Sequence, residues 1–409
     1  MKKKILVLQP NYVKRFKCTG NDCEYHCCHG WKIDIDKKTF KNYRKISNTQ
    51  AIKKVINKNV IINKDGIGND QYAKIILDNN KICPFLDKDG LCTIHMEYGE
   101  NYLSKTCNQY PRIINIVDNM IEKSCHISCP EVTKLLFNEQ AISFDQFEDE
   151  IDIDTYSVCM KLDTNCKNEI NKNFWKLREV SIDMLQNKNF KLHERIFILG
   201  LILDKVQKAI DNGESTKINS IVDESLKKYC NQYIKEYIDN IKFKYTVKFD
   251  LINSICNTKI KDKNVLEDYN NLFLKFLEGI DYDEKNPEYI IKSYKTGYED
   301  IYKPFFDDKE YILENYFVND VFLNLFPVRS GDKIFEEYCI LVIKFAVMKI
   351  FLVGIGKYYK CLDDDKVMKI LYLYSRNIEH TKGYIDSILE AIKEDNNLNM
   401  AFLSLLIKN

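Results

Sequence analysis

Four cysteines and two histidines lie within twelve residues near the start of the chain, from Cys18 to His29. So many soft side chains are unusual on a folded surface, and a thiolate stays deprotonated only beside a soft cation or in an acidifying environment. Nine of the fifteen cysteines fall in the first 129 residues. We therefore interpret this region as a module built around a thiolate-bound metal centre. The nine candidate ligands are Cys18, Cys23, Cys27, Cys28, Cys83, Cys92, Cys107, Cys125 and Cys129.

The rest of the chain favours metal over disulfides as the role of these cysteines. The basic start Met1–Pro10 contains an apolar run of only four residues, which is too short for a signal peptide. The apolar stretch Tyr338–Ile355 is interrupted by Lys344 and Lys349, so it is typical of a buried helix rather than of a bilayer span. We expect a cytoplasmic protein without membrane attachment, in which thiols stay reduced.

The formal net charge of the chain is only +1, so its overall charge does not indicate a nucleic-acid or membrane partner. Locally the balance is uneven. Residues 1–60 carry fifteen Lys or Arg against four Asp or Glu, and residues 276–320 carry twelve acids against five bases. We interpret both runs as solvated faces.

The cysteine pattern permits two kinds of metal site. A closed zinc site takes four Cys or His ligands, and iron–sulfur clusters are also held by cysteine thiolates. The adjacent pair Cys27-Cys28 favours a polynuclear cluster, or a separate role for one of the two, because neighbouring side chains point in different directions in regular structure. Cys125 and Cys129 would share one face if their segment were helical.

Other residues near these cysteines have simpler interpretations. Four histidines lie close to a cysteine, and we expect each to be a structural or hydrogen-bonding partner rather than a ligand. They are His26, His29, His95 and His126. Trp31, Tyr110 and Arg112 are expected to pack around the site. The six later cysteines are interpreted as small buried hydrophobic residues. They are Cys159, Cys166, Cys230, Cys256, Cys339 and Cys361.

The N-terminal third predicts short hairpins. Tyr72–Leu77 and Lys81–Cys83 flank the turn pair Asn79-Asn80, and Asp89-Gly90 is a second turn signal before Leu91–Ile94. Arg112–Val117 and Met120–Lys123 form another candidate hairpin. Asp36–Ile46 predicts a helix that Asp36 caps, Glu131–Phe137 predicts a helix that closes the module, and the acidic stretch Phe144–Asp154 predicts a linker or exposed loop.

The remainder shows apolar residues at helical spacing. We predict a mainly α protein, with a small cysteine-rich α+β metal-binding module carrying antiparallel hairpins at residues 1–137 and a larger all-helical domain at residues 138–409. The predicted helical stretches are Asn173–Gln186, Leu192–Ile210, Ser220–Tyr245, Asn264–Leu277, Lys333–Tyr359, Lys366–Tyr374 and Thr381–Ile407, the last broken near Asn396.

Several motifs, in a fixed order, carry a resemblance to a known family. They are Cys18-x4-Cys23-x3-Cys27-Cys28 with Gly30-Trp31, Cys83-Pro-Phe-Leu, Gly90-Leu-Cys92, Cys107-x2-Tyr110-Pro-Arg112 and Ser128-Cys129-Pro130-Glu131. Over residues 5–137 the chain resembles the flagellin lysine-N-methylase family, and within it the broader cysteine-rich module that chelates zinc or iron.

The resemblance implies an S-adenosylmethionine-dependent protein-lysine N-methyltransferase with flagellin as its protein substrate. It further implies an iron–sulfur cluster, expected to be 4Fe–4S, with zinc as the alternative. No donor-binding or catalytic residue follows from a motif. The radical pattern Cys-x3-Cys-x2-Cys is not met, because Gly30 stands where the third cysteine belongs, and Gly354-Ile-Gly356 lacks the third glycine of a nucleotide-binding turn.

A lysine methylase requires a neutral acceptor amine, because an ammonium has no lone pair. Desolvation lowers the pKa of a lysine, an aromatic cage holds its cation, and a tyrosine or carboxylate takes its proton. We therefore interpret the acidic, tyrosine-rich segment Asp281–Asp320, with Tyr298 and Tyr302, as part of a lysine-binding surface. Two alternatives stay open: a non-enzymatic metal-binding protein with a structural zinc staple or metal-carrier role, and an electron-transfer protein.

Overall fold

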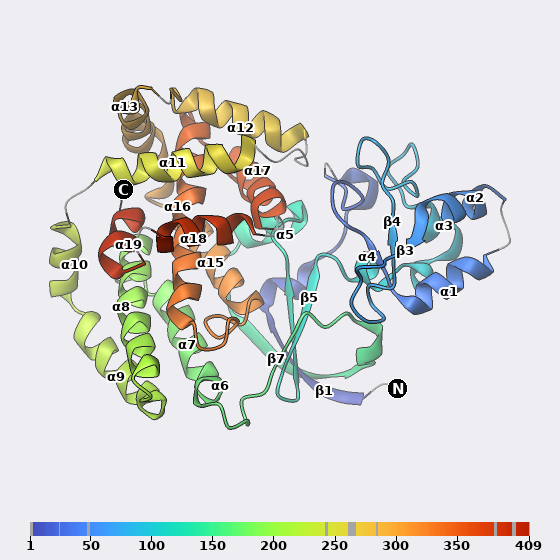
Figure 1. Ribbon diagram of the computed structural model, residues 1–409, viewed down its shortest axis with the longest axis horizontal. Coiled ribbons are helices and arrows are strands. Elements are labelled where there is room, and N and C mark those ends of the chain that lie inside the picture. Colours follow the sequence, from blue (N-terminus) through green and yellow to red (C-terminus); the bar gives the residue numbers. More distant parts are fainter. Residues whose placement is uncertain are drawn as a thin grey trace. The chain divides into compact units, whose positions relative to one another are not determined.

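The computed structural model describes residues 3–23, 25–46, 50–241, 244–260, 267–283, 285–379, 383–394 and 398–408. The chain divides into two compact units, one made of Met1–Leu135 with Phe144–Lys161 and the other of Leu136–Ser143 with Leu162–Asn409. Most described residues are helical, and the strands lie in the N-terminal 162 residues (Figure 1). The predicted mainly helical chain with a small sheet-containing N-terminal region is thus confirmed.

The larger sheet of the first unit has five strands in the order β7-β1-β6-β5-β8. Strand β1 pairs in parallel with β6 and antiparallel with β7, and β5 and β6 form the predicted hairpin around Asp118, whose φ is 55°. A small core of Val7, Ile114, Ile121 and Ile151 packs on this sheet. The strands are β1 (Lys3–Pro10), β5 (Arg112–Val117), β6 (Met120–Cys125), β7 (Phe144–Ile151) and β8 (Met160–Leu162).

The predicted linker at Phe144–Asp154 is wrong, because most of it is strand β7. Two of its acidic residues form ion pairs with lysines, one in β1 and one in the helical turn that follows β1. Glu148 pairs with Lys4 at 2.5 Å, and Asp145 pairs with Lys14 at 3.1 Å. The acidic residues that suggested a solvated loop are therefore paired with basic residues on or next to the neighbouring strand.

The smaller sheet has the order β2-β4-β3, with both pairings antiparallel. Its strands are β2 (Asp34–Ile35), β3 (Val60–Ile62) and β4 (Ala73–Ile75). The predicted hairpin between Tyr72–Leu77 and Lys81–Cys83 is wrong in its pairing. The turn is present, but β4 pairs with β2 and β3, and Ile82 instead bridges His29.

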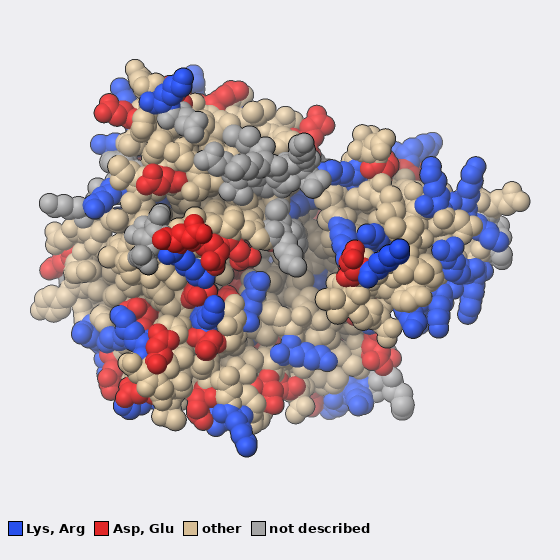
Figure 2. Space-filling view, viewed as in Figure 1, with Lys and Arg blue, Asp and Glu red and all other residues tan. Residues whose placement is uncertain are grey.

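Five helices accompany these sheets: α1 (Lys37–Lys45), α2 (Gln50–Asn59), α3 (Thr93–Tyr98), α4 (Lys105–Gln109) and α5 (Pro130–Phe137). Asp36 caps α1 as predicted, and its carboxylate accepts a hydrogen bond from the Thr39 N–H at 2.9 Å. Helices α1 and α2 contain eight exposed Lys or Arg and no acid. Figure 2 shows these basic side chains gathered over the two helices, which agrees with the solvated basic face that was predicted.

The second unit is a bundle of helices (Figure 1). Two π-helical segments, η6 (Tyr298–Tyr302) and η7 (Ser375–Glu379), interrupt it. The helices are α6 (Glu169–Lys172), α7 (Phe174–Leu185), α8 (Leu192–Asp211), α9 (Ile218–Tyr229), α10 (Gln232–Asp239), α11 (Tyr245–Ile260), α12 (Glu267–Gly279), α13 (Pro287–Gly297), α14 (Lys303–Phe306), α15 (Tyr311–Leu323), α16 (Ile334–Tyr359), α17 (Asp364–Tyr374), α18 (Tyr384–Glu394) and α19 (Met400–Ile407).

The helical predictions hold for the residues that the structure describes, with two qualifications; residues 242–243, 264–266 and 381–382 of the predicted stretches lie outside them. The stretch Ser220–Tyr245 is divided between separate helices, because α9 ends at Tyr229 and α10 begins at Gln232. Asn231 lies between them and caps α10, where its side chain accepts a hydrogen bond from the Tyr233 N–H. The predicted break near Asn396 lies outside the described residues, between α18 and α19.

Helix α16 is the centre of the second unit. Among the described residues it is the one helix long and apolar enough to cross a membrane, and 94% of its apolar window is buried inside the protein. The prediction of a buried helix for Tyr338–Ile355 is therefore confirmed. Gly354 and Gly356 lie inside this helix, so the weak nucleotide-binding motif is a packing feature instead.

The close approach of α12 and α16 depends on two glycines. A Cβ on Gly279 would lie 1.8 Å from the carbonyl oxygen of Gly354, which is backbone and has little freedom to move. We expect Gly279→Ala to lower the free energy of unfolding by about 3 kcal/mol or more. Chemical denaturation measures this, with Asn271→Ala on the exposed side of α12 as control, for which the expected change is within about 0.5 kcal/mol. Equal stability of the two variants would contradict the packing described.

Candidate functional site

Eight of the nine candidate ligands line one cavity of about 410 Å³ in the first unit. They come from four separate stretches of the chain, and the cavity borders the core of the smaller sheet, against which Cys28, Cys92 and Cys107 pack. The eight are Cys18, Cys23, Cys27, Cys28, Cys83, Cys92, Cys107 and Cys129.

Two turns of the same design bring Cys83 and Cys92 to this cavity. In each, the side chain of an aspartate five residues before the cysteine accepts two backbone N–H groups: Asp78 from Asn80 and Ile82, and Asp87 from Asp89 and Leu91. A left-handed residue closes each turn, Lys81 with φ 59° in the first and Gly90 with φ 78° in the second. Such local aspartate–backbone bonds favour turns over extended strand.

Cys107 is positioned by the start of helix α4. The buried Ser104 caps this helix, and its hydroxyl accepts a hydrogen bond from the Cys107 N–H at 3.1 Å. Asp36, which caps α1, also accepts from the Lys105 N–H at 3.1 Å. One buried carboxylate therefore holds the ends of α1 and α4 together and fixes the segment that carries Cys107.

The first cysteine cluster is held mainly by its backbone. The Trp31 indole donates to the Cys27 carbonyl, and the Cys83 N–H donates to the Cys28 carbonyl at 2.8 Å. The thiols of Cys27 and Cys83 are also the neighbours that most affect the pKa of the Cys28 thiol. Both members of the adjacent pair thus reach the cavity.

Cys125 differs from the other eight. It ends strand β6 and is fully buried, and its backbone exchanges hydrogen bonds with the Tyr12 hydroxyl at 3.0 and 3.3 Å. Its side chain is not part of the cavity lining. The proposed helical face shared by Cys125 and Cys129 is wrong, because Cys125 belongs to a strand and Cys129 precedes α5.

Burial raises the pKa of several thiols of this cavity. It raises the pKa of Cys107 to about 12 and of Cys129 to about 12. Burial also raises the pKa of Cys92, although the His95 and Ile94 N–H groups at the start of α3 oppose it. Binding of a soft metal would therefore displace protons from the site.

The donor set is chemically suited to a thiolate-ligated metal. A tetrahedral zinc ion needs four donors within about 2.3 Å of one point. Among the described residues, no group of three or more His, Cys, Asp or Glu side chains is arranged to hold a single metal ion. Eight thiols line the cavity of about 410 Å³. That any of them binds metal stays a prediction.

The other side chains predicted near the site divide into two groups. Trp31, Tyr110 and Arg112 line the cavity, and the Trp31 and Tyr110 ring centroids are 5.2 Å apart. Of the four histidines, His26 and His95 line the cavity, whereas the other two do not.

The tyrosine-rich segment Asp281–Asp320 is not a continuous surface. Tyr294, Tyr302 and Tyr316 are buried, while Tyr289 is 66% exposed. A second pocket of about 90 Å³, within the second unit, includes Tyr298 and Tyr302 but also Lys349 of α16. Sequence reasoning missed Lys349 as a site residue. The available signal was that a lysine interrupts an otherwise apolar helix.

The fold and site together define a two-unit protein, with a cysteine-lined cavity in an α+β unit and a helical second unit. The model of the family described as "FliB lysine N-methylase C-terminal domain" matches residues 178–406, which is more than half of the chain. The chain therefore belongs to the FliB lysine N-methylase family, and the resemblance found in its N-terminal motifs is confirmed.

Similar proteins extend this comparison. A lysine-N-methylase of Salmonella typhimurium is 37% identical over 138 residues, which cover 34% of this chain and 34% of that protein. The flagellar biosynthetic protein FliU of Salmonella muenchen is 37% identical over 138 residues, covering 34% of this chain and 80% of that protein. The match thus spans about a third of the length of the lysine-N-methylase. No solved structure matches the chain.

Proposed function

We propose that this protein is a cytoplasmic protein-lysine N-methyltransferase. It transfers methyl groups from S-adenosylmethionine to lysine ε-amino groups of flagellin, and it carries an iron–sulfur cluster held by its cysteines. The observation that carries the proposal is the convergence of eight thiols on one cavity in a chain of the FliB lysine N-methylase family. The names of its relatives, lysine-N-methylase and flagellar biosynthetic protein, support the reaction and the flagellar substrate.

The residues of the cavity have distinct parts in this proposal. The eight lining cysteines supply more thiolates than the four that a 4Fe–4S cluster takes. Such a cluster, when bound, supplies one-electron chemistry and a site for soft ligands. Trp31 and Tyr110 cover the thiols with apolar surface, and the Ser104 hydroxyl holds the Cys107 backbone in place. Hydrophobic cover of this kind limits solvent access to a metal site.

Methyl transfer to flagellin tests the proposal. Protein purified without air is incubated with methyl-labelled S-adenosylmethionine and unmethylated flagellin, and flagellin peptides are analysed by mass spectrometry. We expect label on flagellin lysines, and we expect chelation of the metal with reduction of the protein to abolish it. Absence of label with a metal-replete protein would contradict the proposed activity.

One observation favours a second candidate, a structural metal staple without catalysis. Cys83 belongs to the core of the first unit, and Cys28, Cys92 and Cys107 pack against it. Structural zinc contributes roughly 10–16 kcal/mol of apparent binding energy in small modules, which is enough to hold this unit together. A staple would leave the purified protein colourless, zinc-loaded and inactive towards flagellin, whereas an iron–sulfur protein is brown.

A further inference from the structure

The outer sides of helices α1 and α2 form one basic surface, which we call the α1–α2 face. Eight lysine or arginine side chains are exposed there, and neither helix contains an aspartate or glutamate (Figure 2). The two helices are tied together, because Arg44 of α1 donates a hydrogen bond to the Asn57 side chain of α2 at 2.9 Å. The eight residues are Lys37, Lys38, Lys41, Arg44, Lys45, Lys53, Lys54 and Lys58.

These eight charges have no acidic partners among the residues that the structure describes. Elsewhere exposed lysines pair within their own helix, as Lys208 of α8 does with Asp204 at 2.6 Å. On α1 the positions four residues apart are instead three like charges, Lys37, Lys41 and Lys45. Like charges at this spacing destabilise a helix. The chain thus carries an unfavourable arrangement that a partner with carboxylates would relieve.

The α1–α2 face belongs to the unit that carries the cysteine-lined cavity. Helix α1 contributes the buried Tyr43 to the cavity lining, while its lysines are exposed to solvent. Its capping residue Asp36 also accepts from the Lys105 N–H at the start of α4, the helix that carries Cys107. A partner on the outer side of α1 therefore lies one helix diameter, roughly 10 Å, from the cavity wall.

Two exposed isoleucines follow directly on α2. The helix leads into strand β3, where Ile61 is 40% exposed and Ile62 is 56% exposed. In the sheet order β2-β4-β3, this strand lies at an edge. Exposed apolar edge strands are contact sites for other chains, and apolar side chains beside a charged rim are typical of protein interfaces.

The composition of the face favours a protein partner over nucleic acid or membrane. Single strands stack on exposed aromatic rings, and α1 and α2 expose none. Arginine forks suit phosphate best, but Arg44 is bound to Asn57 and its guanidinium lies 4.9 Å from the centroid of the Phe40 ring. A membrane-surface helix turns its apolar side to lipid, whereas Ile52 and Ile56 of α2 are buried in the protein core.

We propose that the α1–α2 face, with Ile61 and Ile62, is the docking surface for the protein substrate, which meets it with an acidic surface of its own. This proposal rests on the proposed methyltransferase function, and it names the chemistry by which the enzyme recognises flagellin. Charges at the rim of an interface act mainly on the rate of encounter, and salt screens them. The face therefore governs how well the protein substrate is bound and leaves the chemical step unchanged.

Binding of flagellin tests the docking surface without requiring methyl transfer. The immobilised full-length protein is titrated with unmethylated monomeric flagellin at low and at high salt. The variant Lys38→Glu/Lys41→Glu/Lys45→Glu reverses three exposed charges of α1. We expect it to bind flagellin at least about tenfold more weakly than the wild type at low salt, and we expect high salt to remove most of this difference. A wild-type protein that does not bind flagellin, or equal binding by the variant, overturns the proposal.

Two further variants make the result specific. Lys53→Glu/Lys54→Glu/Lys58→Glu reverses three charges of α2 and should cause a similar loss, so the test does not depend on the folding of one variant. The matched control changes the net charge equally by reversing three exposed lysines of the second unit, and its affinity should stay within about twofold of the wild type. The control is Lys227→Glu/Lys292→Glu/Lys295→Glu. An equal loss in the control overturns the proposal.

Methyl transfer by the same variants separates this proposal from the proposed function. We expect the α1 variant to need roughly tenfold more flagellin for half its maximal rate, with the maximal rate unchanged. A wild type that binds flagellin through this face but does not methylate it contradicts the function alone. A wild type that methylates flagellin with the same concentration dependence as the α1 variant contradicts the docking surface alone.

Other occupants of the face are distinguished in the same binding assay. Double-stranded DNA and vesicles that contain phosphatidylserine replace flagellin as the titrant, and light scattering measures the mass of the protein alone. We expect weaker binding of both titrants than of flagellin and no salt-sensitive dimer. Tighter binding of DNA or vesicles, or a dimer that the α1 variant loses, would assign the face to another partner and overturn the proposal.

Discussion

Replacement of Cys27 by serine is expected to remove most of the bound metal and with it the methyl transfer to flagellin. Cys27 lines the cavity, and its backbone carbonyl accepts a hydrogen bond from the Trp31 indole, which lines the same cavity. A serine hydroxyl is a hard, protonated donor and does not replace a thiolate at a soft metal. We expect at least a tenfold loss of metal, measured by elemental analysis of anaerobically purified protein.

Two control variants make this result specific. Cys159 was predicted to be buried, as was Cys361, but both are exposed. Cys159→Ser therefore changes an exposed cysteine of the same unit, and its metal content should equal that of the wild type. Cys125→Ser changes a buried cysteine outside the cavity lining, and it should also retain metal if the protein folds. Full metal content in Cys27→Ser would exclude this cysteine as a ligand, and loss in Cys159→Ser would contradict the assignment of the centre to this cavity.

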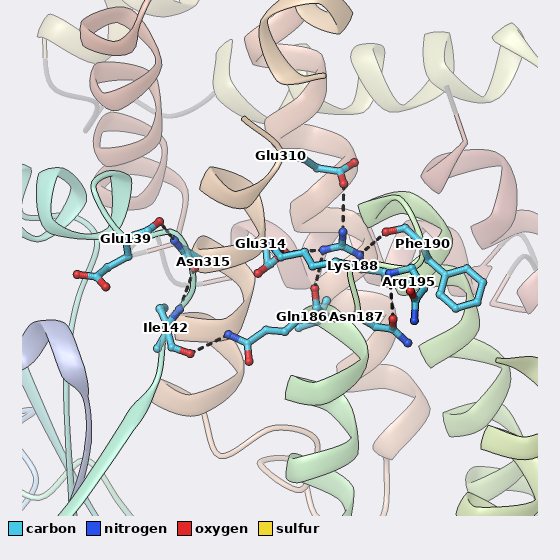
Figure 3. Close-up of polar contacts among 12 residues, drawn as sticks. Glu139, Ile142, Gln186, Asn187, Lys188, Phe190, Arg195, Glu310, Glu314 and Asn315 are labelled. Carbon is cyan, nitrogen blue, oxygen red and sulfur yellow. Dashed lines mark hydrogen bonds and ion pairs between the residues drawn. The ribbon is translucent and has the colours of Figure 1, made fainter. Parts of the chain in front are cut away.

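Replacement of Glu314 by alanine is expected to lower the free energy of unfolding by about 3–5 kcal/mol, because it leaves a buried guanidinium without its partner. Glu314 is fully buried, and it accepts from Arg195 and from Lys188 at 2.5 Å each (Figure 3). The neighbouring Asn315 accepts from the Ile142 N–H at 3.2 Å, so the same turn of α15 also anchors the segment 136–143.

Denaturant unfolding measures this loss, and an exposed ion pair provides the comparison. Glu148→Ala breaks the pair with Lys4, whose side chains are 57% and 70% exposed, and should cost no more than about 1 kcal/mol. A loss below about 1 kcal/mol for Glu314→Ala would mean that Arg195 finds other compensation, since it also donates to the carbonyls of Phe190 and Leu185.

Local patterns in the sequence predicted the parts of this fold that depend on local interactions. The capped helix after Asp36, the turn at Asp118 and the buried helix α16 follow from side chains within a few residues of each other. The cysteine spacing also singled out eight residues that the fold brings to one cavity, although the sequence offered no reason to separate Cys125 from them.

The features that sequence reasoning missed depend on partners far away in the chain. Strand β7 looked like an acidic linker because its partners, Lys4 and Lys14, lie about 130 residues earlier. The parallel pairing of β1 with β6 has no local signal, since parallel strands need a long crossover connection. Lys349 of α16 lies over the rings of Tyr298 and Tyr302 in η6, and only the fold shows that a lysine, rather than solvent, meets these tyrosines.

The central claim is that thiols from four stretches of chain hold one inorganic cluster on which the methyltransferase depends. Its most direct test is the quantification of iron and acid-labile sulfide in the anaerobically purified wild-type protein, with methyl transfer to flagellin assayed on the same sample before and after removal of the metal. We predict iron and sulfide in comparable amounts and activity that disappears with them. A protein that contains zinc or no metal, and still methylates flagellin, would contradict this account.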